Sequence, residues 1–297
     1  MSSEQTPRQR ISSDFAESRI ALAGLALLAA ILLVALLAPL ISPQNPYDLA
    51  QLDVLDSRLP PLAQSRSDGG HTHTYWLGTD DQGRDMLSGI FYGLRISIGV
   101  GVASTLAALA IGLVLGLLAA YFGGWVDTLI MRIVDIQLSF PSILIALILL
   151  ALLGQGLDKI IVALVAVQWA YYARTVRGAA LVERRKEYME AAAGLALSHA
   201  RIVFRHLLPN CLPPLIVVAT VQVAAAIALE ATLSFLGLGL PITEPSLGLL
   251  ISNGFTYMLS GKYWISFFPG VALLATIVSI NLVADQLRDV LNPRLQK

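Results

Sequence analysis

Long stretches without a charged residue constrain the fold of this chain more than any other feature. They cover residues 20–47, 96–126, 136–157, 160–173, 206–229 and 263–284. A helix that crosses about 30 Å of hydrocarbon needs roughly 20 apolar residues, and most of these stretches reach that length. We therefore predict an all-α membrane protein with six spanning helices, over residues 20–41, 95–120, 127–153, 159–181, 212–236 and 264–285. Arg174 and Arg177 shorten the apolar core of the fourth helix, so we expect both to lie near a membrane interface.

Composition excludes several other classes of protein. Of the 297 residues, 56% are hydrophobic and only 13% are charged, whereas about 25% are charged in soluble domains. Twenty basic and twenty acidic residues cancel, so no overall field favours nucleic acid. The single cysteine cannot form an intrachain disulfide, and the spacing of the four histidines matches no zinc finger. We expect no metal, cofactor or catalytic residue in the chain; the pair His71 and His73 is only a weak metal motif.

Basic residues predict how the helices are oriented. Residues 42–94 contain three basic and seven acidic side chains, whereas residues 174–209 contain seven basic and three acidic. Segments rich in Lys and Arg stay in the cytoplasm, and six spans then leave both termini inside. The first apolar run exceeds the 7–15 residues of a signal-peptide core, so it is interpreted as an uncleaved anchor. The predicted parts are a cytoplasmic N-terminus (1–19), a first span (20–41), an outer loop (42–94), a helical core (95–285) with a cytoplasmic loop (182–209), and a cytoplasmic tail (286–297).

The cytoplasmic loop over residues 182–209 is longer than a simple connector requires. It is rich in Ala, Leu, Glu and Arg, which predicts helix, and Ser198 is placed to cap a second short helix before Pro209 starts the return to the membrane. The small residues after Glu190 would let another surface approach closely, which is typical of a docking helix. A basic amphipathic helix lying on an anionic leaflet fits the composition about equally well.

Several motifs along the chain resemble one family of transporters. Glu190-Ala191-Ala192, followed by HLLPN at 206–210, is similar to the EAA loop of ABC importer permeases. Four further motifs resemble the dipeptide, oligopeptide and nickel branch of that family: LGTDDQGRD at 77–85, MRIVDIQLSFP at 131–141, EATLSFLGLG at 230–239 and LRDVLNPRL at 287–295. The glycine that usually follows the EAA triplet falls on Ala196 here, so we expect the turn after the docking helix to be shaped differently while docking is kept.

The resemblance implies the fold of type I ABC importers and a permease of the bacterial inner membrane that moves no solute alone. The expected partners are a homologous second permease, two cytosolic ATPases that bind ATP and Mg, and an extracytoplasmic binding protein. Independently, residues 254–263 have the wrong spacing for a phosphate-binding loop. The resemblance implies that the ATPases contact a coupling set: Glu190, Ala191, Ala192, Gly194, Leu195, Arg201, Arg205 and Pro209. Peptides are the favoured cargo, and nickel chelates or glutathione-like solutes are the alternative.

Two acidic residues lie within predicted spans, where an unpaired charge is costly. Glu230, near the outer end of the fifth span, is a candidate for the substrate path; a hydrogen-bonded carboxyl that ties helices together is equally consistent with its position. Asp135 in the third span follows Arg132 by one turn, which favours a local ion pair.

The outer loop of about 50 residues is too long to be only a connector and is expected to be mostly irregular. Asp80, Asp81, Arg84 and Asp85 cluster just before the second span. They are candidates for seating the binding protein or the second permease, and helix capping explains them about equally well.

Two other classes of protein remain as alternatives, and each lacks its usual signal. A self-sufficient secondary transporter or channel usually has internal repeats, and we find no clear repeat between residues 20–153 and 159–285. An intramembrane hydrolase would need a paired catalytic motif, and neither His-Glu-x-x-His nor Gly-x-Ser-x-Gly occurs.

Overall fold

The computed structural model describes residues 13–48, 52–66 and 73–291. Most of the predicted N-terminus and tail, together with His71, therefore lie outside the described residues. The α-helices are α2 (Arg19–Ile41), α3 (Met86–Phe122), α4 (Gly124–Ser139), α5 (Ser142–Leu153), α6 (Leu157–Glu183), α7 (Glu187–Gly194), α8 (His199–Arg201), α9 (Leu208–Phe235), α10 (Leu247–Phe255) and α11 (Trp264–Leu291). Shorter elements are η2 (Val54–Asp56), η3 (Ile202–Leu207, a π-helix), η4 (Met258–Ser260) and the antiparallel strands β1 (Ala63–Gln64) and β2 (Thr74–Tyr75).

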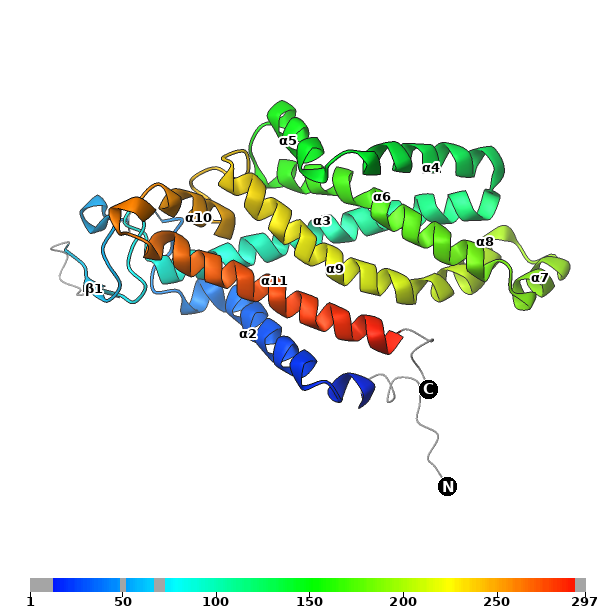
Figure 1. Cartoon of the computed structure of the whole chain (residues 1–297), viewed down its shortest axis with the longest axis horizontal. Helices are drawn as coiled ribbons and strands as arrows, with labels where there is room; N and C mark the ends of the chain where they lie inside the picture. The colour runs from blue at the N-terminus through cyan, green and yellow to red at the C-terminus, as the bar shows by residue number, and fades with distance from the viewer. Residues whose placement is uncertain (1–12, 49–51, 67–72, 292–297) are drawn as a thin grey trace, which may run out of the picture.

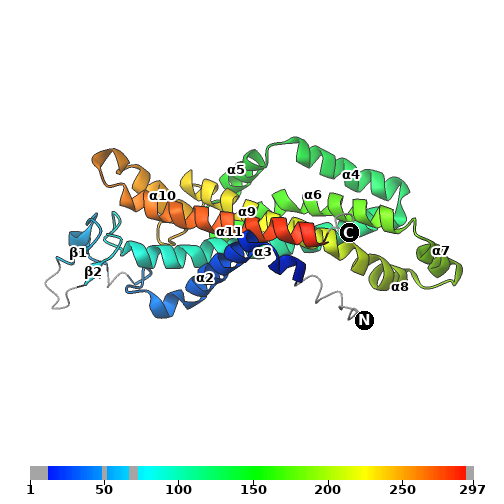
Figure 2. The ribbon, with the colours of Figure 1, turned by 60° about the horizontal axis from the view of Figure 1, so that its bottom comes forward.

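The helices form an elongated bundle with different structures at its two ends. The strands lie at one end of the long axis and α7 at the other, as Figure 1 shows. Helix α2 begins and α11 ends on the α7 side of the bundle, and these two helices pack against each other. Figure 2 shows the same separation of the strands from α7 after rotation. We refer below to the strand end and the α7 end.

Within the described residues, four helices are long and apolar enough to cross a membrane: Arg19–Ile41, Met86–Phe122, the continuous segment His199–Phe235, and Trp264–Leu291. They coincide with the predicted first, second, fifth and sixth spans. The pair α4 and α5 passes the same test only when taken together. Helix α6 has 27 residues, enough for the predicted fourth span, but its charged residues keep it outside the apolar set.

The span predicted over residues 127–153 is formed by two helices instead of one. Helices α4 and α5 are bent by 92° at a break between Ser139 and Ser142. Pro141 occupies the N-cap position of α5, and a proline disfavours helical backbone in the residue before it, here Phe140. Pro269, in contrast, lies inside α11, which continues to Leu291.

Helix α3 begins nine residues earlier than the apolar pattern indicated. The side chain of Asp85 accepts a hydrogen bond of 2.8 Å from the backbone N–H of Ser88, so it caps the helix before Met86. The pattern placed the start near residue 95 because Arg95 interrupts the apolar run. The short helices α10 and η4 were also absent from the prediction, since neither is long enough to show a clear period.

Close contact between α3 and α6 forms the centre of the bundle. A Cβ atom added to Gly112 would lie 2.6 Å from the carbonyl oxygen of Trp169, and one added to Gly116 would lie 2.6 Å from that of Ala173. These two glycines therefore allow α3 and α6 to pack closely. Gly101 similarly meets Ile227 on α9, whereas Gly99 faces open space and takes no part in close packing.

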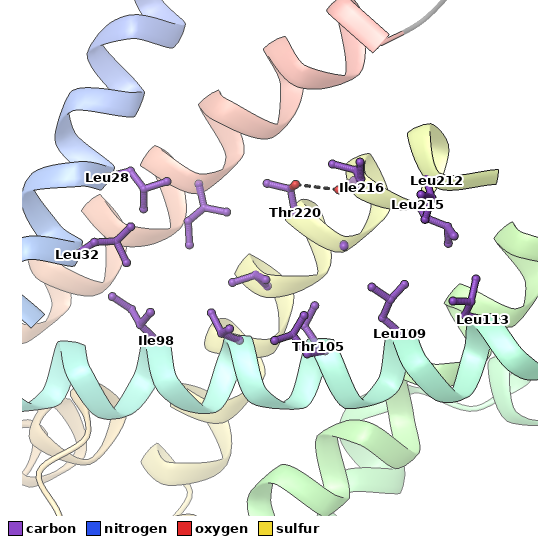
Figure 3. A pocket seen from close by; sticks show the side chains of 15 residues that line it. Leu28, Leu32, Ile98, Thr105, Leu109, Leu113, Leu212, Leu215, Ile216 and Thr220 are labelled. Atoms are coloured by element: carbon purple, nitrogen blue, oxygen red, sulfur yellow. Dashed lines mark hydrogen bonds between the residues drawn. The ribbon is translucent and has the colours of Figure 1, made fainter. Parts of the chain in front are cut away.

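An apolar groove of about 380 Å³ lies between α2, α3, α9 and α11, as Figure 3 shows. Its lining is aliphatic except for Thr105 and Thr220, and the hydroxyl of Thr220 donates to the carbonyl of Ile216 on its own helix, at 2.8 Å. A groove with so few free polar groups does not supply the contacts that a peptide backbone needs.

Candidate functional site

The segment between α6 and α9 (residues 184–207, called the coupling segment below) forms a short helical elbow at the α7 end. It contains α7, α8 and η3, and Pro209 stands in the first turn of α9. A proline in that position leaves no backbone donor unpaired. The predicted helical character of this segment is confirmed. Ser198 precedes α8 as predicted, although its side chain makes no capping hydrogen bond.

One face of the coupling segment is packed into the bundle. Met189 and Ala192 on α7, and Ile202 and Leu207 on η3, are buried at 7% exposure or less. They belong to a single apolar cluster with residues of α3, α6 and α9: Leu117, Ala120, Tyr172, Val176, Ala180, Cys211 and Leu215. Burying several such side chains contributes a few kcal/mol, so the elbow is fixed to the spanning helices.

The opposite face of the coupling segment is exposed. Leu195 is 75% exposed and Phe204 is 67% exposed. The exposed members of the predicted coupling set are Glu190, Ala191, Gly194, Leu195, Arg201, Arg205 and Pro209; Ala192 is buried. Apolar and charged side chains of the predicted coupling set are therefore both accessible.

Polar contacts lock the elbow to the end of α6. The Tyr188 hydroxyl donates a hydrogen bond to Glu183 and accepts one from the side chain of Asn210 at 3.0 Å. Glu183 also pairs with Lys186 at 2.8 Å. Burial and then the Glu183 carboxylate raise the pKa of Tyr188 to about 12. Burial alone would raise the pKa of Glu183, but the hydrogen bonds from Lys186 and Tyr188 lower it overall, so the carboxylate of Glu183 keeps its charge at neutral pH.

A second set of contacts joins the coupling segment to the end of α3. Arg184 donates a hydrogen bond to the carbonyl of Ala120, and its guanidinium lies 5.8 Å from the centre of the Tyr121 ring. The hydroxyl of Tyr121 is in turn hydrogen-bonded to Nδ1 of His199. The coupling segment is therefore connected to α3 as well as to α6.

Ala196 adopts a left-handed backbone conformation, with φ of 50°. This is a conformation that glycine favours, and a residue with a Cβ atom pays roughly 1–2 kcal/mol for it. The alanine therefore carries backbone strain. The expectation that the turn differs in shape from one with the usual glycine stays a prediction.

A cavity of about 990 Å³ opens beside the coupling segment, between α6, α9 and α11. Its polar lining residues are Tyr171, Thr175, Glu183, Lys186, Asn210, Gln222, Asp285 and Arg288. Sequence reasoning missed these residues as a group, because they come from three separate helices. The amides of Asn210 and Gln222, within or next to an apolar run, were the signal that was available.

Glu230 lies in the interior of the bundle at the strand end. It has no exposed surface, and its carboxyl accepts hydrogen bonds of 2.8 Å from the hydroxyls of Ser97 on α3 and Ser234 on α9. This geometry favours a role in tying helices together. Contact with a transported solute stays a prediction.

The predicted ion pair between Arg132 and Asp135 is replaced by pairs between α4 and α6. Asp135 is bonded to Arg174, and Asp127 accepts a hydrogen bond of 2.6 Å from Arg177. These carboxylates partner the two arginines that interrupt the apolar pattern of α6. Pairing lowers the cost of charged groups near hydrocarbon.

The residues before α3 form a compact module with β1 and β2. Its centre is Asp56, whose carboxylate accepts hydrogen bonds from the Ser65 hydroxyl at 2.6 Å, the Arg66 backbone at 2.6 Å and the Tyr75 hydroxyl at 2.9 Å. Burial alone would raise the pKa of Asp56, but these hydrogen bonds lower it overall. We call residues 52–66 and 73–85 the strand module.

Three of the four predicted docking residues are buried within this module. Asp80, Arg84 and Asp85 are at most 2% exposed, and Arg84 pairs with Asp80 at 2.7 Å while donating to the carbonyl of Ile242 at 3.2 Å. Asp81 is partly exposed, and burial followed by repulsion from Asp80 raises its pKa. Capping of α3 by Asp85 supports the structural alternative, and a docking role for the cluster stays a prediction.

Comparison with known proteins identifies the family of this chain. Residues 112–297 match the family described as "Binding-protein-dependent transport system inner membrane component", and residues 6–61 match "N-terminal TM domain of oligopeptide transport permease C". The chain belongs to the first family. It is thus a permease subunit of a binding-protein-dependent transport system.

Curated relatives match this permease over almost its whole length. It is 36% identical to the dipeptide transport system permease protein of Haemophilus influenzae over 99% of the chain and 97% of that protein. It is 35% identical to the dipeptide transport system permease protein of Alkalihalophilus pseudofirmus, over 98% and 91%. It is also 36% identical to the oligopeptide transport system permease protein of Bacillus subtilis, over 95% and 88%.

Solved structures place the permease in the fold of type I ABC importers. The MetNI methionine ABC transporter in an inward-facing conformation aligns with a TM-score of 0.56 at 23% identity, covering 70% of this chain and 98% of that one. An amino acid ABC transporter crystallised with histidines aligns with a TM-score of 0.52 at 13% identity, over 68% and 94%. The expected fold is confirmed.

Proposed function

We propose that this permease is one half of the membrane passage of an ATP-driven importer that carries peptides across the bacterial inner membrane. The cargo is inferred from the relatives named as dipeptide and oligopeptide permeases, each similar over most of its length. Nickel chelates or glutathione-like solutes are the alternative cargo. The chain acts with a homologous second permease, two cytosolic ATPases and an extracytoplasmic binding protein. ATP and Mg belong to the ATPases, and the permease has no catalytic residue of its own.

The observation that carries this proposal is the two-faced coupling segment. Its buried face is fixed to α3, α6 and α9, while its exposed face presents Glu190, Ala191 and Leu195. Such a segment would move as one rigid unit with the attached helix ends. Motion of a protein docked on its exposed face would therefore move those helix ends. Ala191 lets the docked surface approach closely, and the charges of Glu190, Arg201 and Arg205 would set its register.

The charge distribution supports the orientation of the chain. Seven basic and three acidic residues lie between positions 174 and 209, at the α7 end, whereas the strand module and its flanks are acidic. By the positive-inside rule the α7 end faces the cytoplasm, with both termini, and the strand module faces outward. The cytosolic ATPases then meet the coupling segment directly.

The cavity of about 990 Å³ beside the coupling segment is the candidate for the inner part of the transport path. It opens beside α6, α9 and α11, and its lining mixes apolar side chains with the amides of Asn210 and Gln222 and with charged groups. Such a lining suits a peptide, which offers both backbone amides and ionised termini. The second permease would close the open side.

Site-directed cross-linking tests the docking role. Cys211 is buried, so a cysteine introduced at Leu195 offers an accessible thiol for a maleimide–benzophenone reagent. In the assembled transporter, Leu195→Cys should cross-link to an ATPase on illumination. The matched control is Leu259→Cys, which is fully exposed at the strand end and should give no ATPase product. Equal labelling from both positions, or none from Leu195 in an active complex, would contradict the proposal.

A further inference from the structure

A small pocket lies between α3 and the start of α6, toward the strand end of the bundle. Its volume is about 310 Å³, and it is lined by six residues of α3, by Leu157 and Ile161 of α6, and by Tyr47. Arg95 is the one charged residue in this lining. The cavity beside the coupling segment is lined by α6, α9 and α11 instead, and the two spaces share no lining residue.

Arg95 has no counter-charge within the described part of the chain. It is exposed, and its side chain forms neither an ion pair nor a hydrogen bond with another described residue. Arg84, Arg174 and Arg177, in contrast, each pair with an aspartate. A charge at the edge of the hydrocarbon is costly while it is unpaired. The guanidinium of Arg95 is therefore available to an anion from outside the chain.

The depth of Arg95 in the membrane indicates which anion reaches it. Helix α3 runs from the strand end to the α7 end (Figure 1), and Arg95 directly precedes the charge-free run over residues 96–126. Leu157, on the opposite wall of the pocket, likewise lies just before the charge-free run of α6, residues 160–173. Since about 20 helical residues cross the hydrocarbon, both positions lie at its boundary. Phospholipid phosphates are the anions of that layer.

Two tyrosines stand at the same level of the pocket. The ring centres of Tyr47 and Tyr92 are 5.4 Å apart, and the ring planes are inclined by 74°. Tyrosine is typical of the membrane interface, where the ring is in apolar surroundings and the hydroxyl reaches polar groups. Burial and then the Glu244 carboxylate raise the pKa of Tyr47, so its hydroxyl keeps the proton that it could donate. Glu244 itself is not part of the pocket lining.

The rest of the pocket is apolar and lies deeper along α3. Gly99 and Ala103 follow Arg95 at intervals of four residues, so the three share one face of the helix, and all are exposed. A Cβ atom added to Gly99 would meet nothing within 4 Å. Ile96 and Ile161 add aliphatic walls. This lining suits an acyl chain, whereas the amides of a peptide would lack hydrogen-bond partners there.

We propose that this pocket binds a phospholipid of the leaflet at the strand end, with its phosphate on Arg95 and one acyl chain over Gly99 and Ala103. A guanidinium binds phosphate through two parallel N–H donors, and the Tyr47 hydroxyl supplies a further donor. By the orientation proposed above, this leaflet is the outer one. The inference goes beyond the proposed function, since it holds whatever the cargo is.

Photo-cross-linking of lipid to the complete transporter tests the site. The probe is phosphatidylglycerol with a diazirine on one acyl chain, in nanodiscs of phosphatidylethanolamine and phosphatidylglycerol, and mass spectrometry of peptides locates the adducts. Adducts should concentrate in residues 95–103 and 157–161. Arg95→Gln should reduce them roughly fivefold or more, because the charge-assisted bonds are lost, while Arg95→Lys keeps at least half of them.

A second variant blocks the acyl chain and leaves the charge in place. Gly99→Leu should reduce the adducts as strongly as Arg95→Gln, with the melting temperature of the complex not lowered, because the added side chain enters open space. The matched control is Lys159→Gln. It removes a basic side chain at the same level of α6 that donates to the carbonyl of Gln155 at 3.2 Å and lies outside the pocket lining, so the adducts should not change.

Absence of adducts from these residues in the wild type would overturn the lipid site, as would adducts that persist in both Arg95→Gln and Gly99→Leu. An equal loss in Lys159→Gln would overturn it too, because any basic side chain at the interface would then act alike. Adducts that disappear when peptide is added would assign the pocket to the cargo. Loss of pairing between the two permeases in Arg95→Gln would assign Arg95 to that interface, and either result would refute the proposal.

Discussion

Glu230 on α9 accepts a hydrogen bond of 2.8 Å from the hydroxyl of Ser97 on α3, so a fully buried carboxyl joins two spanning helices. A second hydroxyl, that of Ser234, also donates a hydrogen bond to this carboxyl. The carboxyl therefore stabilises the packing at the strand end. We expect substitution of Glu230 mainly to lower the free energy of unfolding.

Substituting Glu230 separates a structural role from an electrostatic one. Glu230→Gln keeps one acceptor and adds a donor, so we expect a loss of less than about 1 kcal/mol, while Glu230→Leu leaves two buried hydroxyls unpaired and should cost about 1–3 kcal/mol. Thermal unfolding of the purified complex measures both. The ratio of cationic to neutral peptide uptake should stay the same in Glu230→Gln; a selective loss of cationic peptides would mean that the carboxylate contacts the cargo.

Ala196→Gly should stabilise the coupling segment by about 1 kcal/mol, because it relieves the left-handed conformation of Ala196. Hydrogen exchange of the amides around residues 195–198 should slow about fivefold. The control is Ala200→Gly in the short helix α8, where glycine should speed exchange. Faster exchange in both variants would contradict strain at Ala196.

Gly112→Ala should disrupt the contact between α3 and α6, because the added methyl group would lie 2.6 Å from the Trp169 carbonyl and 2.5 Å from Cβ of Tyr172. Overpacking of this kind costs about 1–3 kcal/mol. Gly99→Ala on the same helix meets nothing within 4 Å and should gain roughly 0.5–1 kcal/mol from helix propensity. Comparing the melting temperatures of the two variants tests the contact, and equal effects would refute it.

The strand module should lose stability at both extremes of pH. Its hydrogen bonds hold the pKa of Asp56 below its ordinary value, despite burial, so this stabilisation is complete above about pH 5 and is lost as the pH falls through the folded pKa. Burial and Asp56 raise the pKa of Tyr75, so its contribution is present below about pH 10 and is lost as the pH rises further.

Fluorescence of Trp76 measures this pH dependence when the other three tryptophans are replaced by phenylalanine. The emission should change below about pH 4 and above about pH 10, with a plateau between these limits. Asp56→Asn should flatten the acid limb and weaken the alkaline limb without abolishing it, because burial still raises the pKa of Tyr75. An acid limb that is unchanged in Asp56→Asn would show that another group controls it.

The sequence predicted the fold well wherever length and apolarity decide it. The bounds of α2 and α6 lie within two residues of those predicted. The early start of α3 was missed, because a capping aspartate acts through local backbone geometry that a hydropathy pattern does not record.

The functional site could be predicted from the sequence only in part. The coupling segment is contiguous in sequence, so its motif could be found directly. The polar cavity combines Glu183, Asn210 and Asp285 from three helices, and only packing brings them together. Arg174 could be recognised in the sequence as a charged residue within an apolar run. Its partner Asp135 could not, because it is 39 residues away in the chain.

Uptake of labelled peptide into proteoliposomes tests the central claim most directly. The account predicts no flux with this chain alone, ATP-dependent uptake with the second permease, the ATPases and the binding protein, and loss of at least nine-tenths of that uptake in Glu190→Lys with assembly in the membrane unchanged. Robust peptide flux through the chain alone, or full uptake by the Glu190→Lys complex, would contradict it.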